Sequence, residues 1–382
     1  MRRDIFTEEH EIFREQVRRF IETEIAPKLE QWKRDGITDR ATWRRAGEQG
    51  FLGVNAPEEY GGADAGFLYD AIIIEELARV RGHDLMISLH SDICIPYLTS
   101  YGSEEQKRKS LPRAISGELL LALAMTEPGT GSDLANVQTK ALRDGDHYVV
   151  NGAKTFISNG QLADLVIVVA KTDPEADPPH NGISLLLVEA DTPGFERGRN
   201  LEKIGLKGQD TSELFFHDCR VPLNGLLGQE GQGFKMLMEK LQQERLSIAV
   251  GSIAACRRSL EDTVAYVKER KAFGRPIARF QNTQFKLAEL ATEIEIGQAF
   301  VDKLLVAHVR GDEIVTEVSM AKYWITDLQK KVASECLQLF GGYGFMREYP
   351  ISSDYCDAAV QSIYAGTNEI MKLIISRRMG LG

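Results

Sequence analysis

The spacing of apolar residues divides the chain into three parts. In residues 1–118 they recur every three or four positions, which is typical of amphipathic helices. Helices are expected after an N-cap at Thr7, over 42–49, over 70–81, and after the capping-box sequence that begins at Ser103. The first stretch therefore predicts an α-helical domain.

From Leu119 to about Gly231 the pattern changes to short apolar runs separated by turn residues. Asp144-Gly145-Asp146 and Asn151-Gly152 are turn signals. Strands are expected over 119–125, 147–151, 154–157, 165–170, 183–188 and 213–216. Because no helical crossover separates them, the pattern favours a β-sandwich or barrel over a parallel sheet.

Long helical periods return at Gly233. Helices are expected over 233–270, 281–310 and 314–339, and a last helix starts at Gly366-Thr367. That last helix should turn Ile370, Leu373 and Ile374 inward. Antiparallel helices with short connections form a bundle. The predicted fold is therefore α+β and multidomain: an α-helical domain over 1–118, a β-sandwich or barrel over 119–232, and a C-terminal four-helix bundle over 233–382.

One acidic residue interrupts the apolar stripe of the first long helix. Glu244 lies at helical spacing between Leu241 and Ile248. Burying an unpaired charge is costly, so such a residue either finds a partner or carries a raised pKa. A carboxylate with a raised pKa is a good general base near neutral pH. The alternative is that Glu244 lies at the edge of the stripe and reaches a partner through a surface opening.

Composition excludes several classes of protein. The formal net charge is −10, from 46 basic and 56 acidic residues, which argues against nucleic-acid binding. The five cysteines are scattered and indicate reduced, mostly buried thiols, while the seven histidines form no pair with metal-ligand spacing. No apolar run is long enough for a membrane span. Residues 1–11 contain no apolar signal core, so we expect a cytoplasmic protein, or a mitochondrial-matrix one if this is a mature eukaryotic chain.

Four short segments could bind a ligand. The turn in Leu123–Ser132 is rich in hydroxyls and glycines, whose backbone N–H groups suit a phosphate or a heterocycle edge, or it is an ordinary β-turn. Phe156 and Ser158 share one side of a strand and could flank a flat ring, or Phe156 is a core residue.

The third segment, Gly366–Glu369, could bind an anion at a helix start or simply cap it. The fourth is the helix break at Pro276, where Arg270 and Gln281 could bind phosphate or form a solvated face. No GxGxxG fingerprint or P-loop is present.

The order and wording of these segments resemble the acyl-CoA dehydrogenase family over nearly the whole chain, and its long-chain members most. The stretches that carry the resemblance are GFLGVNAPEEYGG (50–62), AMTEPGTGSDL (124–134), NGAKTFISNG (151–160), QERL (243–246), RKAFGR (270–275), QLFGGYG (338–344) and YAGTNE (364–369). Many members carry the catalytic Glu where this chain has Ala365. A subgroup places it in a QERL-like turn, which here gives Glu244.

The resemblance implies sites residue by residue. Matches to positions around the flavin ring and ribityl chain are Leu123, Met125, Thr126, Gly131, Ser132, Phe156, Ile157 and Ser158. Matches near the cofactor's phosphates are Thr367 and Glu369, and Asn368 between them is a further cofactor-binding candidate. Matches to positions that contact the adenine half of a neighbouring subunit's flavin are Arg270, Gln281, Gln338, Leu339, Phe340, Gly341 and Gly342. Matches on the substrate side are Ser132, Lys235, Gln242, Gln243, Arg245, Ala365 and Gly366.

The implied activity is FAD-dependent α,β-dehydrogenation of an acyl-CoA thioester to the trans-2-enoyl-CoA. Glu244 would remove the α-proton, a hydride would pass from the β-carbon to flavin N5, and the Ala365 backbone N–H would help bind the thioester oxygen. The resemblance also implies a homotetramer and an electron-transferring flavoprotein as electron acceptor. The alternatives are an acyl-CoA oxidase or flavin monooxygenase of the same fold, or a non-catalytic acyl-binding relative.

Overall fold

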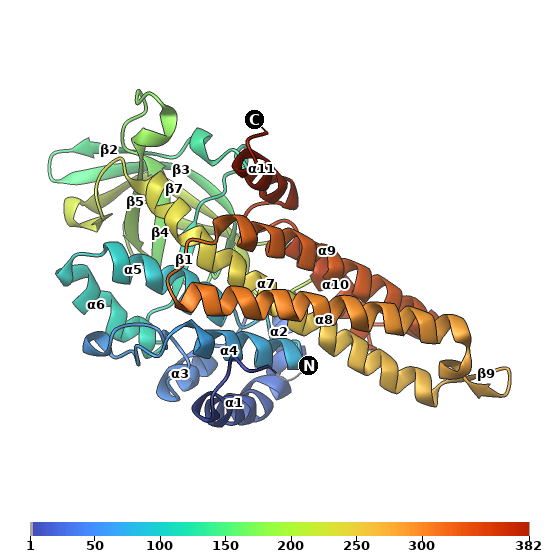
Figure 1. The fold of residues 1–382 in the computed structure, drawn as a ribbon. Coiled ribbons are helices and arrows are strands. Elements are labelled where there is room, and N and C mark those ends of the chain that lie inside the picture. Colours follow the sequence, from blue (N-terminus) through green and yellow to red (C-terminus); the bar gives the residue numbers. More distant parts are fainter. Residues whose placement is uncertain (1–2, 382) are drawn as a thin grey trace.

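The computed structural model describes residues 3–381; residues 1, 2 and 382, at the ends of the predicted first and last domains, lie outside this range. The described chain forms a helical group, then a sheet, then long helices, so the predicted order of α, β and α is confirmed (Figure 1). The long helices extend away from the sheet, and the N-terminal helices lie along one side of both.

The N-terminal group contains six α-helices. Predicted starts are confirmed at Thr7, which forms a capping box with His10, and at Ser103, which forms one with Gln106. Two π-helical turns, η1 and η4, interrupt the regular helices. The elements are α1 (Glu8–Phe20), η1 (Ile21–Ile25), α2 (Leu29–Asp35), α3 (Arg40–Glu48), α4 (Phe67–Val80), η4 (Leu89–Cys94), α5 (Ile95–Tyr101) and α6 (Glu104–Ile115).

The middle of the chain forms one curved sheet that folds onto itself. Its strand order is β6-β7-β3-β2-β4-β5-β8, with β1 paired to β4. Strands β2 and β4 meet only at Lys140 and Lys171, so the sheet divides there into two halves. The strands are β1 (Leu121–Ala124), β2 (Lys140–Asp144), β3 (His147–Ser158), β4 (Leu165–Lys171), β5 (Ile183–Glu189), β6 (Phe195–Asn200), β7 (Thr211–Pro222) and β8 (Leu226–Leu227).

Side chains from both halves share one core, which is the arrangement of a sandwich. Val150 and Phe216 come from one half, and Val168 and Leu186 from the other, and all four are almost fully buried. Two pairings, β1 with β4 and β2 with β4, are parallel, although the remaining pairings in this sheet are antiparallel.

Two strand predictions are wrong in detail. Asn151-Gly152 is not a turn, because β3 runs unbroken through it and absorbs the glycine as a register shift opposite β7. Strands β2 and β6 were not predicted. Their outward faces are charged, and β6 buries only Phe195, so neither shows an apolar run.

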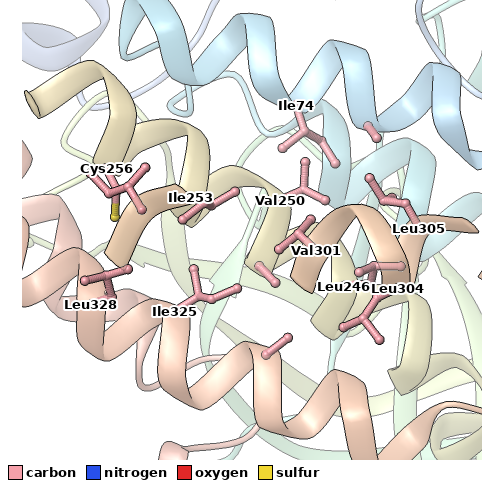
Figure 2. Close-up of a cluster of buried hydrophobic side chains, with 14 of the residues drawn as sticks. Ile74, Leu246, Val250, Ile253, Cys256, Val301, Leu304, Leu305, Ile325 and Leu328 are labelled. Atoms are coloured by element: carbon pink, nitrogen blue, oxygen red, sulfur yellow. The ribbon is translucent and has the colours of Figure 1, made fainter. Parts of the chain in front are cut away.

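The C-terminal helices build the second large core. The 37-residue α7 (Gly233–Glu269) packs against α8 (Gln281–Val309) and α9 (Val315–Phe340). Figure 2 shows Val250 and Ile253 of α7 among Val301 of α8 and Ile325 of α9, with Ile74 of α4 covering one side. No helix within residues 3–381 has the length and hydropathy needed to cross a membrane.

The structure has one C-terminal helix that the sequence did not predict. Helix α10 (Pro350–Gln361), which was not predicted, packs on α9 and α7 through buried residues such as Ile351. The last helix, α11 (Asn368–Arg378), lies on α9 near the sheet end of the bundle. It buries Asn368 and Met371, whereas Leu373 is 41% exposed, so the predicted inward face is wrong for Leu373. Each turn of α10 mixes small polar and apolar residues, which hides its helical period.

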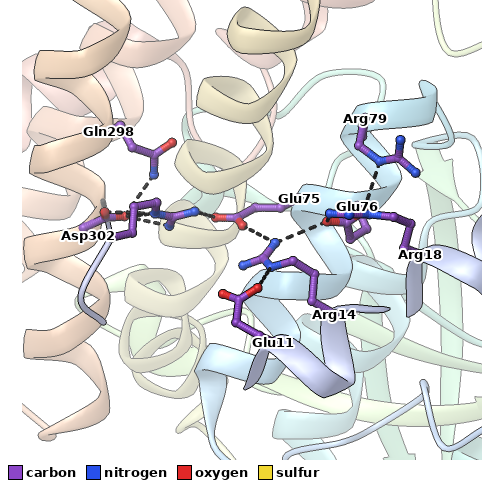
Figure 3. A network of polar contacts seen from close by, with 9 residues as sticks. Glu11, Arg14, Arg18, Glu75, Glu76, Arg79, Gln298 and Asp302 are labelled. Atoms are coloured by element: carbon purple, nitrogen blue, oxygen red, sulfur yellow. Dashed lines mark hydrogen bonds and ion pairs between the residues drawn. The ribbon is translucent and has the colours of Figure 1, made fainter. Parts of the chain in front are cut away.

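Charged side chains join the N-terminal segment to the bundle (Figure 3). Arg3 donates to Asp302 of α8 and to Glu75 of α4, each at 2.6 Å. Arg14 of α1 donates to Glu75 at 2.8 Å and to Glu76 at 3.3 Å. Because these contacts link α1, α4 and α8, they fix the helical domain against the long helices.

Glu76 is the most buried acid of this network, and its removal should be costly. It is 4% exposed and accepts hydrogen bonds from Arg14 and Arg18. Burial opposes its ionisation, but Arg18 and Arg14 lower the pKa of Glu76 below the ordinary value. Glu76→Gln should therefore reduce the free energy of unfolding at neutral pH. Removing one partner of a buried pair costs roughly 3–5 kcal/mol, and the lower end applies because Arg18 is partly exposed.

Urea unfolding at several pH values tests this. A lowered pKa contributes stability above the unfolded-state pKa, and that stability is lost as pH falls through the folded-state pKa. The difference between wild type and Glu76→Gln should therefore shrink in acid. Glu22→Gln is the control: Glu22 is 53% exposed and pairs with Arg79, so its loss should cost about 1 kcal/mol or less. Equal effects of both variants would contradict the argument.

Candidate active site

The acidic residue on the apolar stripe of α7 is buried where α5 meets this helix. Glu244 is 4% exposed, and its Oε1 accepts a hydrogen bond from the Tyr97 hydroxyl at 3.0 Å. Burial raises the pKa of Glu244 to about 7, although Tyr97, Arg245 and Lys240 each act to lower it. The group can therefore take up a proton near neutral pH.

The neighbouring residue connects α7 to the turn before α11. Arg245 is 4% exposed, and its Nε approaches the Ala365 carbonyl at 3.5 Å. Ala365 has φ +50° and Gly366 has φ +90°, so two successive residues adopt the left-handed region. Within residues 3–381 the Ala365 N–H finds no hydrogen-bond acceptor. The turn thus presents a free donor beside the helix that carries Glu244.

A buried lysine of α9 holds this turn in place. Lys322 of α9 has no exposed surface, and its Nζ donates to the Gly366 carbonyl at 2.8 Å and to Asn368 Oδ1 at 3.1 Å. The Asn368 amide in turn donates to the Tyr323 carbonyl and to Asp327. Burial, with the charge of Arg245, lowers the pKa of Lys322 to about 7.

On the sheet side, the end of β1 lies beside β3. The Thr155 N–H donates to the Thr126 carbonyl at 2.9 Å. Lys154, fully buried, donates to the Met125 carbonyl at 3.0 Å and to Glu127 at 2.9 Å. The Glu127 carboxylate also accepts from the Thr139 N–H, so it closes the loop after β1. These contacts set the backbone of Met125 and Thr126 against β3.

Phe156 on β3 is strained and exposed. It has φ +60°, rare for an aromatic residue, and is 66% exposed, while the next residue, Ile157, is 2% exposed. Strained backbone that presents an apolar ring to solvent is a recurrent feature of binding sites. Phe156 therefore offers a flat apolar surface next to the backbone of Thr126.

A separate pocket lies on the bundle, where α7 and α9 end. It encloses about 430 Å³, and it is lined by Tyr266, Arg270, Ile277, Gln338, Leu339, Phe340, Gly341, Gly342, Tyr343 and Met346. The Arg270 guanidinium lies 5.3 Å from the centre of the Tyr343 ring. Six of the seven residues that the sequence assigned to an adenine site line this pocket, and Gln281 is the exception.

Family models match three consecutive parts of the chain. The models describe the acyl-CoA dehydrogenase N-terminal domain (7–118), middle domain (122–219) and C-terminal domain (231–380). The chain belongs to the acyl-CoA dehydrogenase family. Family members are FAD-dependent oxidoreductases that dehydrogenate acyl-CoA in fatty-acid and branched-chain acyl-CoA metabolism.

Individual relatives cover the chain from end to end. The mouse mitochondrial long-chain specific acyl-CoA dehydrogenase is 51% identical over 377 residues, which is 99% of this chain and 88% of the relative. The crystal structure of an acyl-CoA dehydrogenase from Geobacillus kaustophilus has a TM-score of 0.98 and 55% identity, and covers 99% of this chain and all of that one. A structure described as the FAD complex of PigA has a TM-score of 0.92 and 28% identity, with 98% of each chain covered.

The family's cofactor fits the residues present. A flavin needs a flat apolar contact for its ring and backbone polar groups at its edge, and Phe156 lies beside the exposed backbone of Thr126. Gly131 and Ser132, after the turn that follows β1, are exposed and open to a ligand, and Ser158 is half-buried. Leu123 at the end of β1 and Met125 just after it are half-buried.

Two of the predicted cofactor-binding residues have buried side chains. The Asn368 side chain is 3% exposed and all its polar atoms are used within the protein, so it holds the turn. The Ile157 side chain lies in the sheet core, and only its backbone is left to face a ligand. Thr367 caps α11 by accepting from the Ile370 N–H, and Glu369 is exposed.

The predicted substrate residues on α7 separate into two groups. Gln242 bonds the Ile314 N–H and the Asp312 carbonyl, so its amide joins α7 to the loop before α9 and is not free for substrate. Gln243 donates to the Asp92 carbonyl of η4 at 2.7 Å. By contrast, Lys235 is 71% exposed at the start of α7.

Sequence reasoning missed Tyr97, Lys154 and Lys322. A signal existed for Lys322, because it lies between the apolar positions Val318 and Ile325 at helical spacing, as Glu244 lies between Leu241 and Ile248. The signal for Lys154 was weaker, since β3 shows no clear alternation around it. Tyr97 gave none, because its partner is 147 residues away.

Loss of the buried lysine should destabilise the turn. Lys322→Met keeps the side-chain volume but leaves the Gly366 carbonyl without its donor. An unsatisfied buried acceptor costs about 1–3 kcal/mol, and urea unfolding should show a loss of this size. Lys331→Met, on the same helix, is the control. Lys331 forms an exposed pair with Glu293, so its loss should change the free energy of unfolding by about 1 kcal/mol or less. Wild-type stability in Lys322→Met would refute the proposed support.

Proposed function

We propose that the protein catalyses α,β-dehydrogenation of an acyl-CoA thioester to the trans-2-enoyl-CoA, with Glu244 as the base that removes the α-proton. One observation carries the proposal: a buried carboxylate of pKa about 7 lies next to Arg245, which touches the turn that presents the free Ala365 N–H. A proton acceptor and a hydrogen-bond donor for a carbonyl oxygen are the two groups that the reaction requires.

Glu244 acts on the α-carbon of the thioester. The α C–H bond breaks and the proton passes to the carboxylate. The electron pair of that bond delocalises onto the oxygen of the thioester carbonyl. A pKa near 7 keeps a large fraction of Glu244 ionised at neutral pH while making the protonated form accessible. Burial excludes water and strengthens the interaction between the carboxylate and the substrate.

The turn at Ala365 and Gly366 stabilises the charge that develops on the thioester oxygen. The Ala365 N–H donates to that oxygen, and a donor of this kind typically contributes about 3–4 kcal/mol to the transition state. Lys322 and Arg245 hold the two carbonyls of the turn, so the N–H needs no reorganisation during the reaction. Ala365 has no carboxylate, which leaves Glu244 as the base.

FAD, when bound, supplies the acceptor for the hydride that leaves the β-carbon. The residues that would hold it are the exposed face of Phe156 with Ser158 and the backbone from Leu123 to Thr126. Gly131 and Ser132 would add polar contacts, and Thr367 and Glu369 at the start of α11 would lie near its phosphates, as the family resemblance implies. Ser132 and the exposed Lys235 are the candidates for contacts with the CoA thioester.

We also propose a homotetramer that passes its electrons to an electron-transferring flavoprotein, as the family resemblance implies. The pocket around Arg270 lies toward the end of the bundle that carries the short strand β9 (Lys271–Ala272), far from the large sheet (Figure 1). Large apolar residues stand exposed beside it: Phe273 is 95% exposed and Phe345 is 81% exposed. Such residues are typical of a surface that a neighbouring subunit covers.

The base assignment has a direct test. Glu244→Gln is nearly isosteric and should keep the fold, bound FAD and acyl-CoA binding. Anaerobic reduction of the flavin by a saturated acyl-CoA is measured as the loss of the flavin's yellow colour. Its rate should fall by roughly 10²–10⁴-fold, because the proton acceptor is gone. The control is Glu261→Gln: Glu261 is an exposed residue of the same helix, and this variant should reduce its flavin at the wild-type rate. A near wild-type rate in Glu244→Gln would disprove this role.

The distal pocket has a separate test. Arg270→Ala should weaken FAD retention, with Kd rising roughly tenfold or more, since a hydrogen bond to a charged group contributes about 1.5–3 kcal/mol. The rate per bound flavin should change little, because Arg270 is remote from Glu244. Arg279→Ala is the control, as Arg279 is exposed nearby but does not line the pocket. Equal FAD affinity in wild type and Arg270→Ala, measured by fluorescence titration, would count against a cofactor role.

A further inference from the structure

The hydroxyl that touches Glu244 belongs to one of the most buried residues in the protein. Tyr97 has no exposed surface, and its hydroxyl donates to Oε1 of Glu244 at 3.0 Å. Among residues 3–381, Glu244 Oε2 accepts no such bond. The contact therefore distinguishes the two carboxylate oxygens, and it leaves Oε2 to receive a proton.

Two further contacts hold α5 in register with α7. One turn beyond Tyr97, Ser100 accepts a hydrogen bond from Lys240 at 2.6 Å, and Tyr101 donates to Glu239 at 2.6 Å. Positions 97, 100 and 101 lie on one face of α5. The three contacts together prevent α5 from sliding or rotating along α7, so the Tyr97 hydroxyl stays on the carboxylate.

The turn before α5 is a π-helix, and it is anchored as well. In η4, the Asp92 carbonyl accepts the Gln243 amide, and the buried Asp92 carboxyl bonds that of Asp70 on α4. A π-helical turn changes the direction of the residues that follow it, and such turns often occur at functional sites. Here the residue next to Glu244 holds the turn that directs Tyr97.

We propose that Tyr97 is a positioning residue for the base: its hydroxyl holds the Glu244 carboxylate in one orientation and stabilises the ionised form. The inference rests on the proposed function, since it concerns the base named there. It adds a residue that touches neither substrate nor flavin, and whose effect on the reaction passes through Glu244 alone.

The other groups around Glu244 do not replace this contact. Lys240 and Arg245 lie on its own helix and act through charge, without a hydrogen bond to the carboxylate. From η4 comes the buried thiol of Cys94. More distant groups are His308 of α8, which bonds Gln243, and Lys322 of α9, whose charge acts on Arg245.

Removal of the hydroxyl should shift the pH dependence in a defined direction. A hydrogen bond to the ionised form lowers the pKa of a carboxyl, so Tyr97→Phe should raise the pKa of Glu244 above its value of about 7. The rate of flavin reduction depends on ionised Glu244, so its rise with pH should move up by about 1–2 pH units. Below the wild-type midpoint the rate should fall roughly 10–100-fold, and at high pH it should largely recover.

The control is Tyr60→Phe: Tyr60 is also buried and donates to a carboxylate, that of Glu104 at 3.0 Å, but within residues 3–381 it makes no hydrogen bond to α7, so the wild-type midpoint should be kept. A readout independent of turnover is the infrared band of the protonated carboxyl, assigned to Glu244 by its absence in Glu244→Gln. Its titration midpoint in the protein without substrate should rise in Tyr97→Phe. If that variant does not fold, Tyr97→3-fluorotyrosine keeps the ring and strengthens the donor, and the midpoint should move to lower pH.

Two results would overturn the inference: a Tyr97→Phe midpoint equal to that of wild type, or a rate reduced by the same factor at every pH, which indicates a structural role only. An unshifted 3-fluorotyrosine midpoint would overturn it as well. A fast Glu244→Gln variant would overturn the proposed function instead. The two failures are therefore distinguishable, because the first leaves Glu244 essential and the second does not.

Discussion

The cost of burying charge determines how the parts of this protein meet. Glu244 and Lys322 are both almost fully buried, and each would cost several kcal/mol in the interior without a partner. Glu244 finds Tyr97 on α5, and Lys322 finds Gly366 in the turn before α11. Each partner comes from a distant part of the sequence, so satisfying these charges fixes α5, α7, α9 and the turn relative to one another.

Helix α7 combines two environments along its 37 residues. Its middle, around Val250 and Ile253, is closely packed by α8 and α9 and by α4, so the helix cannot move as a unit (Figure 2). One to two turns earlier the same helix carries Glu244 against α5. A functional side chain on a rigid, packed element is held more precisely than one on a loop. The apolar core thus gives the polar site its geometry.

Local pattern made much of this structure predictable. Helical period and capping residues located α7 and α1, and the charge at Glu244 was visible because it breaks an apolar stripe. The predictions failed where the pattern is weak or the partner is distant. Helix α10 mixes small polar and apolar residues, the glycine at 152 is absorbed within β3, and Tyr97 is an ordinary aromatic residue until the fold brings it to Glu244.

The proposed assignment of the base to α7 and of the hydrogen-bond donor to the turn at Ala365 has a physical reason. A residue with φ +50° is strained, and the strain is tolerated most easily by a small side chain. Ala365 can therefore serve as a backbone donor, whereas a carboxylate there would have to be positioned from a strained turn. With the acid on α7, its position depends on helix packing and on Tyr97, and the turn has only to present one N–H. The two proposed tasks thus fall to separate elements, which Arg245 of α7 joins through its contact with the Ala365 carbonyl.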